Sequence, residues 1–211
     1  MSDIPVLYGF DGSTYVRTTR CVLHRKGIDY EQIPLNVLEG DPKKPEHLKR
    51  HPFGKVPVLD IDGMRLRETE AICRYLDESR PEPALMPADA AGRARAGQCI
   101  NLIDSYGYDA LVGAAGCHLF PDFLGNPSDA AHQDMVERGK TLLTLLTEIK
   151  DGDPWLSGAQ VGLADYFLGP IIAYIAMTEH KDEMLAIGGL SDWWARLSAD
   201  ETFVGTAPDL G

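Results

Sequence analysis

Residues 52–78 read PFGKVPVLDIDGMRLRETEAICRYLDE, a pattern that predicts two strands, a tight turn and a helix. Residues 56–61 form a run rich in β-branched side chains. Asp62 and Gly63 follow as the dipeptide that favours a type I′ hairpin, because both central residues of that turn need a positive φ. Pro57 cannot donate a hydrogen bond to a strand ladder, so we expect it at the start of the first strand. A return strand and apolar side chains at helical spacing complete the stretch.

This stretch resembles the second half of the glutathione-binding domain of glutathione transferases, which is a thioredoxin-like unit. The resemblance implies a cis bond between Val56 and Pro57, and an exposed Val56 main chain that pairs with the cysteinyl backbone of glutathione. It also implies that Glu68 and Thr69, at the start of the helix, bind the γ-glutamyl group. A tripeptide ligand needs a strand edge, a carboxylate for its ammonium and a helix N-terminus for its carboxylate. An ordinary hairpin with a capped helix is the alternative, although the agreement runs along the whole stretch.

Composition limits the class of partner. The chain has 211 residues with 44% hydrophobic composition, enough for one large domain or two modest ones. A net charge of −12 argues against nucleic acid or an anionic membrane as a partner. The four cysteines form no CxxC pair, and MSDIPVLYGF shows no signal-peptide pattern, so we expect reduced thiols and a cytoplasmic location. Residues 161–177 favour a buried helix over a membrane span.

The chain before residue 52 carries four predicted elements in the order strand, helix, strand, helix: residues 4–8, 13–26, 29–35 and 45–50. The usual right-handed crossover makes the first two strands parallel. Together with the hairpin they predict an α/β thioredoxin-like domain over residues 1–80. Residues 79–87 hold three prolines and read as a linker. Only helical patterns follow, so we expect an all-α domain over residues 88–211, which is again the glutathione transferase architecture.

The helical patterns of the second half are five: residues 89–116, broken by several glycines, 128–150, 162–178, a short piece near 183, and 191–198. The third begins with Gly-Leu-Ala-Asp at residues 162–165, similar to the family's buried helix start, in which Ser or Thr is the N-cap. Gly162 stands where that hydroxyl is expected, so half of the reciprocal capping box is missing, at a cost of roughly a few tenths of a kcal/mol.

Residues 7–20, LYGFDGSTYVRTTR, resemble the serine-type transferases of the phi and related bacterial classes. In these a serine begins the first helix and hydrogen-bonds the glutathione sulfur, and Ser13 lies at that position. A hydroxyl donor and a helix N-terminus together stabilise a thiolate. A plain N-cap is the commonest reason for a serine here, and Tyr8 and Thr14 are rival thiolate stabilisers. No cysteine begins this helix, so disulfide exchange is not expected.

Lys43 and Lys55 are candidate partners for the glycine carboxylate of glutathione. Lys43 falls where the phi class has a lysine and Lys55 replaces a usual glutamine, although a single exposed lysine is more often only solvated. His47 and His51 stand four residues apart, a spacing seen in metal sites. No third ligand is indicated, so we expect no metal.

The second substrate is expected between the domains, near Phe10, Tyr106, Leu111 and Phe120, although apolar residues at helical spacing more often form the core. The sequence therefore predicts a glutathione transferase with glutathione as co-substrate, no further cofactor, and a homodimeric assembly as is usual in the family. The glutathione thiolate is expected to attack a small electrophilic molecule. A glutathione-dependent dehalogenase, isomerase or peroxidase, or a non-catalytic binding or regulatory protein of the same fold, are the alternatives.

Overall fold

The computed structural model describes residues 4–209 and divides them into two compact units. The first unit comprises residues 4–84 together with 201–209, and the second comprises residues 85–200. We expected the second domain to extend to the end of the chain. Helix α10 (Glu201–Gly205) packs instead on α1 (Thr14–Arg25), within the first unit.

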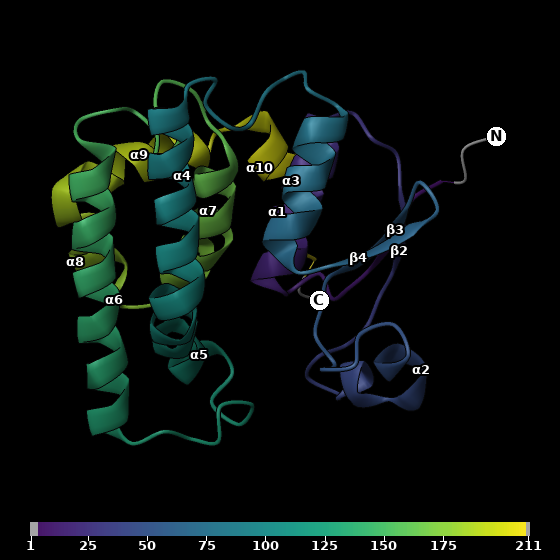
Figure 1. The fold of residues 1–211 in the computed structure, drawn as a ribbon. Helices are drawn as coiled ribbons and strands as arrows, with labels where there is room; N and C mark the ends of the chain where they lie inside the picture. The colour runs from purple at the N-terminus through teal and green to yellow at the C-terminus, as the bar shows by residue number, and fades with distance from the viewer. Residues whose placement is uncertain (1–3, 210–211) are drawn as a thin grey trace. The chain divides into compact units, whose positions relative to one another are not determined.

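The first unit is built on a four-stranded sheet in the order β2-β1-β3-β4 (Figure 1). Its strands are β1 (Val6–Tyr8), β2 (Glu31–Ile33), β3 (Val58–Ile61) and β4 (Met64–Arg67). Strand β1 runs parallel to β2 and antiparallel to β3, and β3 runs antiparallel to β4. Asp62 and Gly63 join β3 to β4 with φ values of 51° and 75°. The predicted hairpin, with a positive φ at both central residues, is confirmed.

Helices cover both faces of this sheet (Figure 1). Helices α1 and α3 (Thr69–Ser79) pack together on one face, and the short α2 (Pro45–Leu48) with the 3₁₀ turn η1 (Asp41–Lys43) lies on the other side. Leu7 and Leu59 are register partners on β1 and β3, and both are fully buried, as are Val16, Ile72 and Leu76 of the two helices. Because strand side chains alternate between faces, Tyr8 lies on the face opposite Leu7.

The C-terminal helix is tied to the middle of α1. Arg17, which is 7% exposed, donates from Nη2 to the carbonyl oxygen of Phe203 at 2.9 Å, and its guanidinium lies 3.8 Å above the Phe203 ring. One turn further along α1, Cys21 Sγ and Thr206 Oγ1 are 3.1 Å apart in the buried core. The last described residues therefore complete the core of the first unit.

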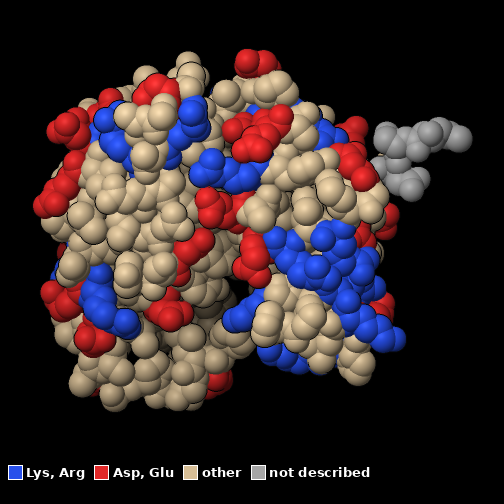
Figure 2. All heavy atoms as spheres, in the orientation of Figure 1, with Lys and Arg blue, Asp and Glu red and all other residues tan. Residues whose placement is uncertain are grey.

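Surface charge is uneven despite the net charge of −12. In Figure 2, Lys and Arg side chains gather over the part of the first unit that holds β4 and α2. The basic side chains thus form a local patch on the first unit.

The second unit contains only helices: α4 (Ala90–Leu102), the π-helical η2 (Ile103–Val112), α5 (Gly113–Leu119), α6 (Asp129–Lys150), α7 (Leu163–Ile175), α8 (Lys181–Leu185), the 3₁₀ turn η3 (Ile187–Gly189) and α9 (Leu190–Leu197). Helix α7 is the most buried of them, with nearly every residue inside. Among the residues described, no helix is both long and apolar enough to cross a membrane.

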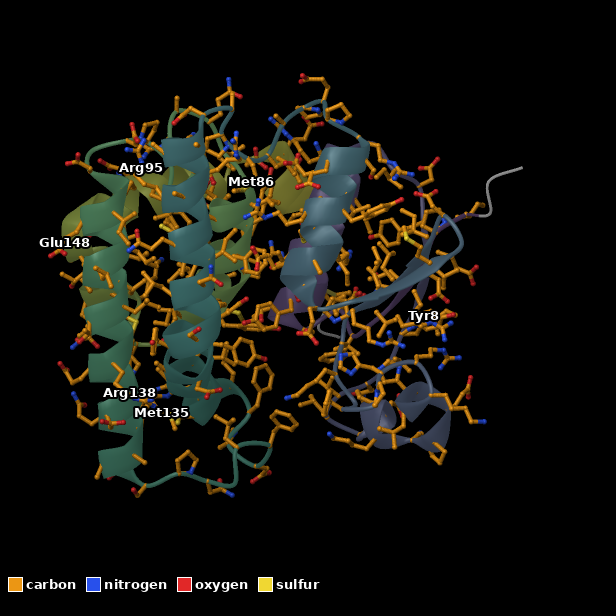
Figure 3. All side chains as sticks on the ribbon, viewed as in Figure 1. Tyr8, Met86, Arg95, Met135, Arg138 and Glu148 are labelled. Carbon is orange, nitrogen blue, oxygen red and sulfur yellow. The ribbon has the colours of Figure 1, made fainter. Side chains whose placement is uncertain are left out.

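Glycines in residues 103–119 do not break the helix, contrary to expectation. A Cβ at Gly107 would collide with the Leu142 side chain of α6, and one at Gly113 would lie 2.6 Å from Sδ of Met135, which is labelled in Figure 3. These glycines let η2 and α5 approach α6 closely, and the chain continues without a break through the π-helical η2 into α5.

A buried carboxylate organises the start of α7. Asp165, which is 0% exposed, accepts N–H bonds from Leu156, Ser157, Gly162 and the Trp193 indole at 2.8 to 3.3 Å. Burial raises the pKa of this carboxyl above its ordinary value, while the four donors oppose that rise.

The hydroxyl that Gly162 lacks comes from elsewhere in the chain. Ser157 Oγ accepts the N–H of Ala164 at 3.2 Å, inside the first turn of α7. A Cβ at Gly162 would collide with the carbonyl oxygen of Leu85 and lie 2.7 Å from Ser157 Cβ. Asp165 thus supplies its half of the capping box, and Ser157 supplies a hydroxyl to the first turn in place of the N-cap side chain. Glycine is needed at residue 162 because the Leu85 backbone and Ser157 lie so close.

Candidate active site

Ser13 is the N-cap of α1, with φ −77° and ψ 124°. Its Oγ accepts the N–H of Val16 at 3.4 Å, and the residue is half-buried. A hydroxyl has one proton and two lone pairs, so the cap bond leaves the proton to donate. The N-terminus of α1 adds a partial positive charge at the same place.

The loop that carries Ser13 is fixed from two sides. Asp11 Oδ1 accepts from Gln32 Nε2 of β2 at 2.6 Å and lies 3.4 Å from Nη1 of Arg20 on α1. A Cβ at Gly9 would collide with Val16. The end of β1 therefore lies tightly against α1, which holds the Ser13 hydroxyl in position.

The two rival hydroxyls are placed differently. Tyr8 lies on the α2 side of the sheet (Figure 3), where its O–H donates to Asp60 Oδ2 at 3.3 Å and Arg50 lies 4.5 Å above its ring. Arg65 holds the pKa of Asp60 below its usual range, so this acceptor stays ionised. Thr14 is 4% exposed, and its Oγ1 has no partner among the described residues. Of the three, Ser13 has the accessible hydroxyl.

The segment before β3 presents a free main chain. The Val56–Pro57 bond is cis, as the resemblance implied. His47 Nε2 bonds the carbonyl oxygen of Lys55 at 2.8 Å. Within residues 4–209, no hydrogen bond engages the N–H or C=O of Val56, which lies two residues before the ladder of β3 begins. An extended peptide can pair there.

Glu68 has an unusual backbone conformation for a residue with a side chain. Its φ of 65° and ψ of 121° lie in a region that costs about 1–3 kcal/mol and that clusters at ligand clamps. The Glu68 side chain is 78% exposed, and Thr69 begins α3 beside it. An exposed carboxylate at a helix N-terminus suits an ammonium and a carboxylate on one ligand.

Two histidines support these segments from inside. His47 and His51 are 1% and 2% exposed, and His51 Nε2 lies 3.6 Å from Glu68 Oε1. Burial lowers the pKa of His51, and Glu68 opposes that shift. In the sequence this pair showed only a spacing seen in metal sites, and no metal was expected from it. In the structure His47 contacts the Lys55 carbonyl oxygen just before Val56, and His51 lies beside Glu68. The signal in the sequence for this supporting role was the pair of histidines, four residues apart, directly before residues 52–57 (PFGKVP).

Both candidate lysines are exposed. Lys43 Nζ donates to the carbonyl oxygen of Phe53 at 2.9 Å, so it lies against the loop that Lys55 continues.

The four residues expected at the second substrate divide between the units. Phe10 is half-buried in the first, and its carbonyl oxygen accepts the N–H of Ser13 at 2.9 Å. In the second unit Tyr106 is 67% exposed, and Phe120 packs edge-on against Tyr174. Leu111 is fully buried with its side chain beside Gly139 of α6, so it is a core residue with no surface for a ligand.

Comparison with known proteins identifies the family of this chain. Residues 7–84 match the family model described as glutathione S-transferase, N-terminal domain. Glutathione S-transferase 4 of Zea mays is 30% identical over 199 residues, which cover 92% of this chain and 87% of that protein. Maleylacetoacetate isomerase of Pseudomonas aeruginosa is 31% identical over 177 residues, 78% of each chain. The solved glutathione S-transferase I from mais, in complex with an atrazine glutathione conjugate, shares 26% identity and 96% of each chain, with a TM-score of 0.82. The chain belongs to the glutathione S-transferase family.

Proposed function

We propose that Ser13 activates glutathione in this glutathione transferase. The observation that carries the proposal is the position of the Ser13 hydroxyl, half-exposed at the N-terminus of α1 with its proton left to donate. The glutathione sulfur accepts this hydrogen bond and lies in the partial positive charge of the helix end.

The stabilisation has a calculable effect. A thiol with a pKa of about 8.5 is about 3% thiolate at pH 7. Lowering that pKa by roughly one to two units raises the thiolate to about 24–76%. The thiolate then attacks an electrophilic carbon, and the leaving group departs with the displaced electron pair.

The rest of glutathione is bound by the neighbouring segments. The free Val56 main chain, next to Pro57, pairs with the cysteinyl backbone, and Glu68 and Thr69 bind the γ-glutamyl group. Lys43 and Lys55 bind the glycine carboxylate. The strained backbone of Glu68 supports this assignment, since such strain clusters at ligand clamps.

Tyr106 and Phe120 of the second unit are the proposed contacts of the electrophile, while Leu111 acts only by packing. This contact is tested by measuring the KM for the electrophile in Tyr106→Ala. We expect that KM to rise while the KM for glutathione stays unchanged.

Isomerase activity is the second candidate, because isomerases are among the relatives. The isomerase of Rhizobium meliloti is 41% identical over 95 residues, 45% of this chain. Assaying maleylacetoacetate beside a panel of halogenated, hydroperoxide and other electrophilic substrates separates isomerisation from conjugation, dehalogenation and peroxidase activity. If the protein does not bind glutathione, it would instead be a non-catalytic protein of the same fold that binds another ligand or a protein partner.

The decisive experiment is a thiolate difference spectrum of bound glutathione against pH, for the wild type, Ser13→Ala and Tyr8→Phe. We expect a thiol pKa well below 8.5 in the wild type and Tyr8→Phe, and a return toward that value in Ser13→Ala. Turnover at pH 7 should fall about tenfold or more in Ser13→Ala, with glutathione still bound. A depressed pKa that persists in Ser13→Ala assigns the role to Tyr8 or Thr14 and refutes the proposal.

We also propose a cytoplasmic homodimer, from the family resemblance and from four cysteines that form no disulfide among the described residues. Phe53, 76% exposed on the loop before Val56, is an apolar contact for a second copy. Light scattering that gives twice the 23.1 kDa chain mass supports the dimer, and a single chain mass refutes it.

A further inference from the structure

Three histidines lie close together in the second unit, and none of them belongs to the proposed glutathione site. His118 lies in the last turn of α5, His132 in the first turn of α6, and His180 just before α8. One ring nitrogen from each lies within 4.8 Å of the other two. His132 Nε2 and His180 Nε2 are 3.1 Å apart.

These distances fit a shared metal ion. With Zn–N bonds of about 2.0–2.1 Å, tetrahedral geometry places two ligand nitrogens about 3.3 Å apart and their ring centres about 5.2 Å apart. The ring centroids of His118, His132 and His180 are 5.0, 5.4 and 5.0 Å from one another. The spacing of the three ring centres therefore matches that of three imidazoles around one ion.

A carboxylate orients one of the rings. His180 Nδ1 lies 2.7 Å from Glu183 Oε1. A carboxylate only accepts, so Nδ1 of the neutral ring carries the proton and the Nε2 lone pair is left for a metal. The other Glu183 oxygen is held by Lys140 Nζ at 2.7 Å, which fixes the carboxylate. This carboxylate–histidine arrangement is the usual support of a metal-bound imidazole.

We propose that His118, His132 and His180 form a binding site for a divalent transition metal such as Zn²⁺. Neutral imidazole suits Zn²⁺ and its neighbours in the first transition row. Glu179, whose Oε1 lies 3.6 Å from His118 Nε2, adds a negative charge beside the site. The ion connects the end of α5, the start of α6 and the turn before α8.

The test uses the full chain without a histidine tag, stripped with a chelator. Calorimetric titration with ZnCl₂ should give one saturable site per chain, and Co²⁺ should give the visible absorption of tetrahedral nitrogen ligation. His132→Gln and His180→Gln should abolish this site, and Glu183→Gln should weaken it about 10–100-fold.

Two further variants keep the result interpretable. His118 is 36% exposed by side chain, so His118→Gln removes a ligand with little effect on folding, and circular dichroism checks each variant. His24→Gln changes an exposed histidine of α1 and should bind as the wild type does. Zn²⁺ should raise the melting temperature of the wild type and His24→Gln but not of His118→Gln. The absence of saturable binding in the wild type, or unchanged binding in His132→Gln and His180→Gln, would overturn the site.

Discussion

Replacing Asp165 by Asn tests the buried carboxylate at the start of α7. Its Oδ1 accepts from the Leu156 N–H and the Trp193 indole, both at 2.8 Å. Its Oδ2 accepts from the N–H groups of Gly162 at 3.0 Å and Ser157 at 3.3 Å. The amide of Asn has the same shape but only one acceptor oxygen.

The expected cost follows from the donors that lose a partner. Whichever way the amide is turned, two of the four N–H groups face an NH₂ and are left unpaired. An unpaired buried donor costs about 1–3 kcal/mol, so the free energy of unfolding should fall by about 2–6 kcal/mol. Since whole proteins are stable by about 5–15 kcal/mol, this is a large loss.

The assay is urea unfolding, followed by tryptophan fluorescence and by circular dichroism. Asp192→Asn, an exposed aspartate on α9, is the matched control and should stay within about 0.5 kcal/mol of the wild type. A cost below about 1 kcal/mol for Asp165→Asn would refute the reasoning. It would mean that burial, which raises the pKa of this carboxyl, keeps it neutral already.

Two other predictions concern Gly162 and His51. Gly162→Ser restores the family's hydroxyl but collides with Leu85 and Ser157, so urea unfolding should show a loss of about 1–3 kcal/mol, and a gain would contradict the packing argument. Burial lowers the pKa of His51, so the unfolded chain binds its proton near 6.5 while the folded chain does not, and stability falls as pH drops below that value. The melting temperature should fall less between pH 7.5 and 5.5 in His51→Asn than in the wild type, and equal falls would show that His51 contributes nothing.

Local patterns in the sequence predicted the first unit well. The hairpin follows from Asp62 and Gly63 themselves, and the start of α1 from Ser13, because turn and cap preferences depend on neighbouring residues. The glutathione transferase family was likewise readable from short motifs. Helix starts and strands were therefore predictable without knowledge of tertiary packing.

Features set by distant residues were not predictable in this way. Gly107 was interpreted as a helix breaker, because nothing near it in sequence indicates the Leu142 side chain against which it packs. The replacement of the Gly162 cap by Ser157 depends on a loop folding back. The three histidines lie on separate elements and form no sequence motif, so only the fold brings them together.

The attachment of α10 to α1 has a consequence for biosynthesis. Phe203 and Thr206, which complete the core around Arg17 and Cys21, are translated only after residues 85–200 of the helical unit. The core of the first unit can therefore be completed only after the helical unit has been made. A fragment of residues 1–84 should accordingly be cut by protease faster than the same residues in the full chain.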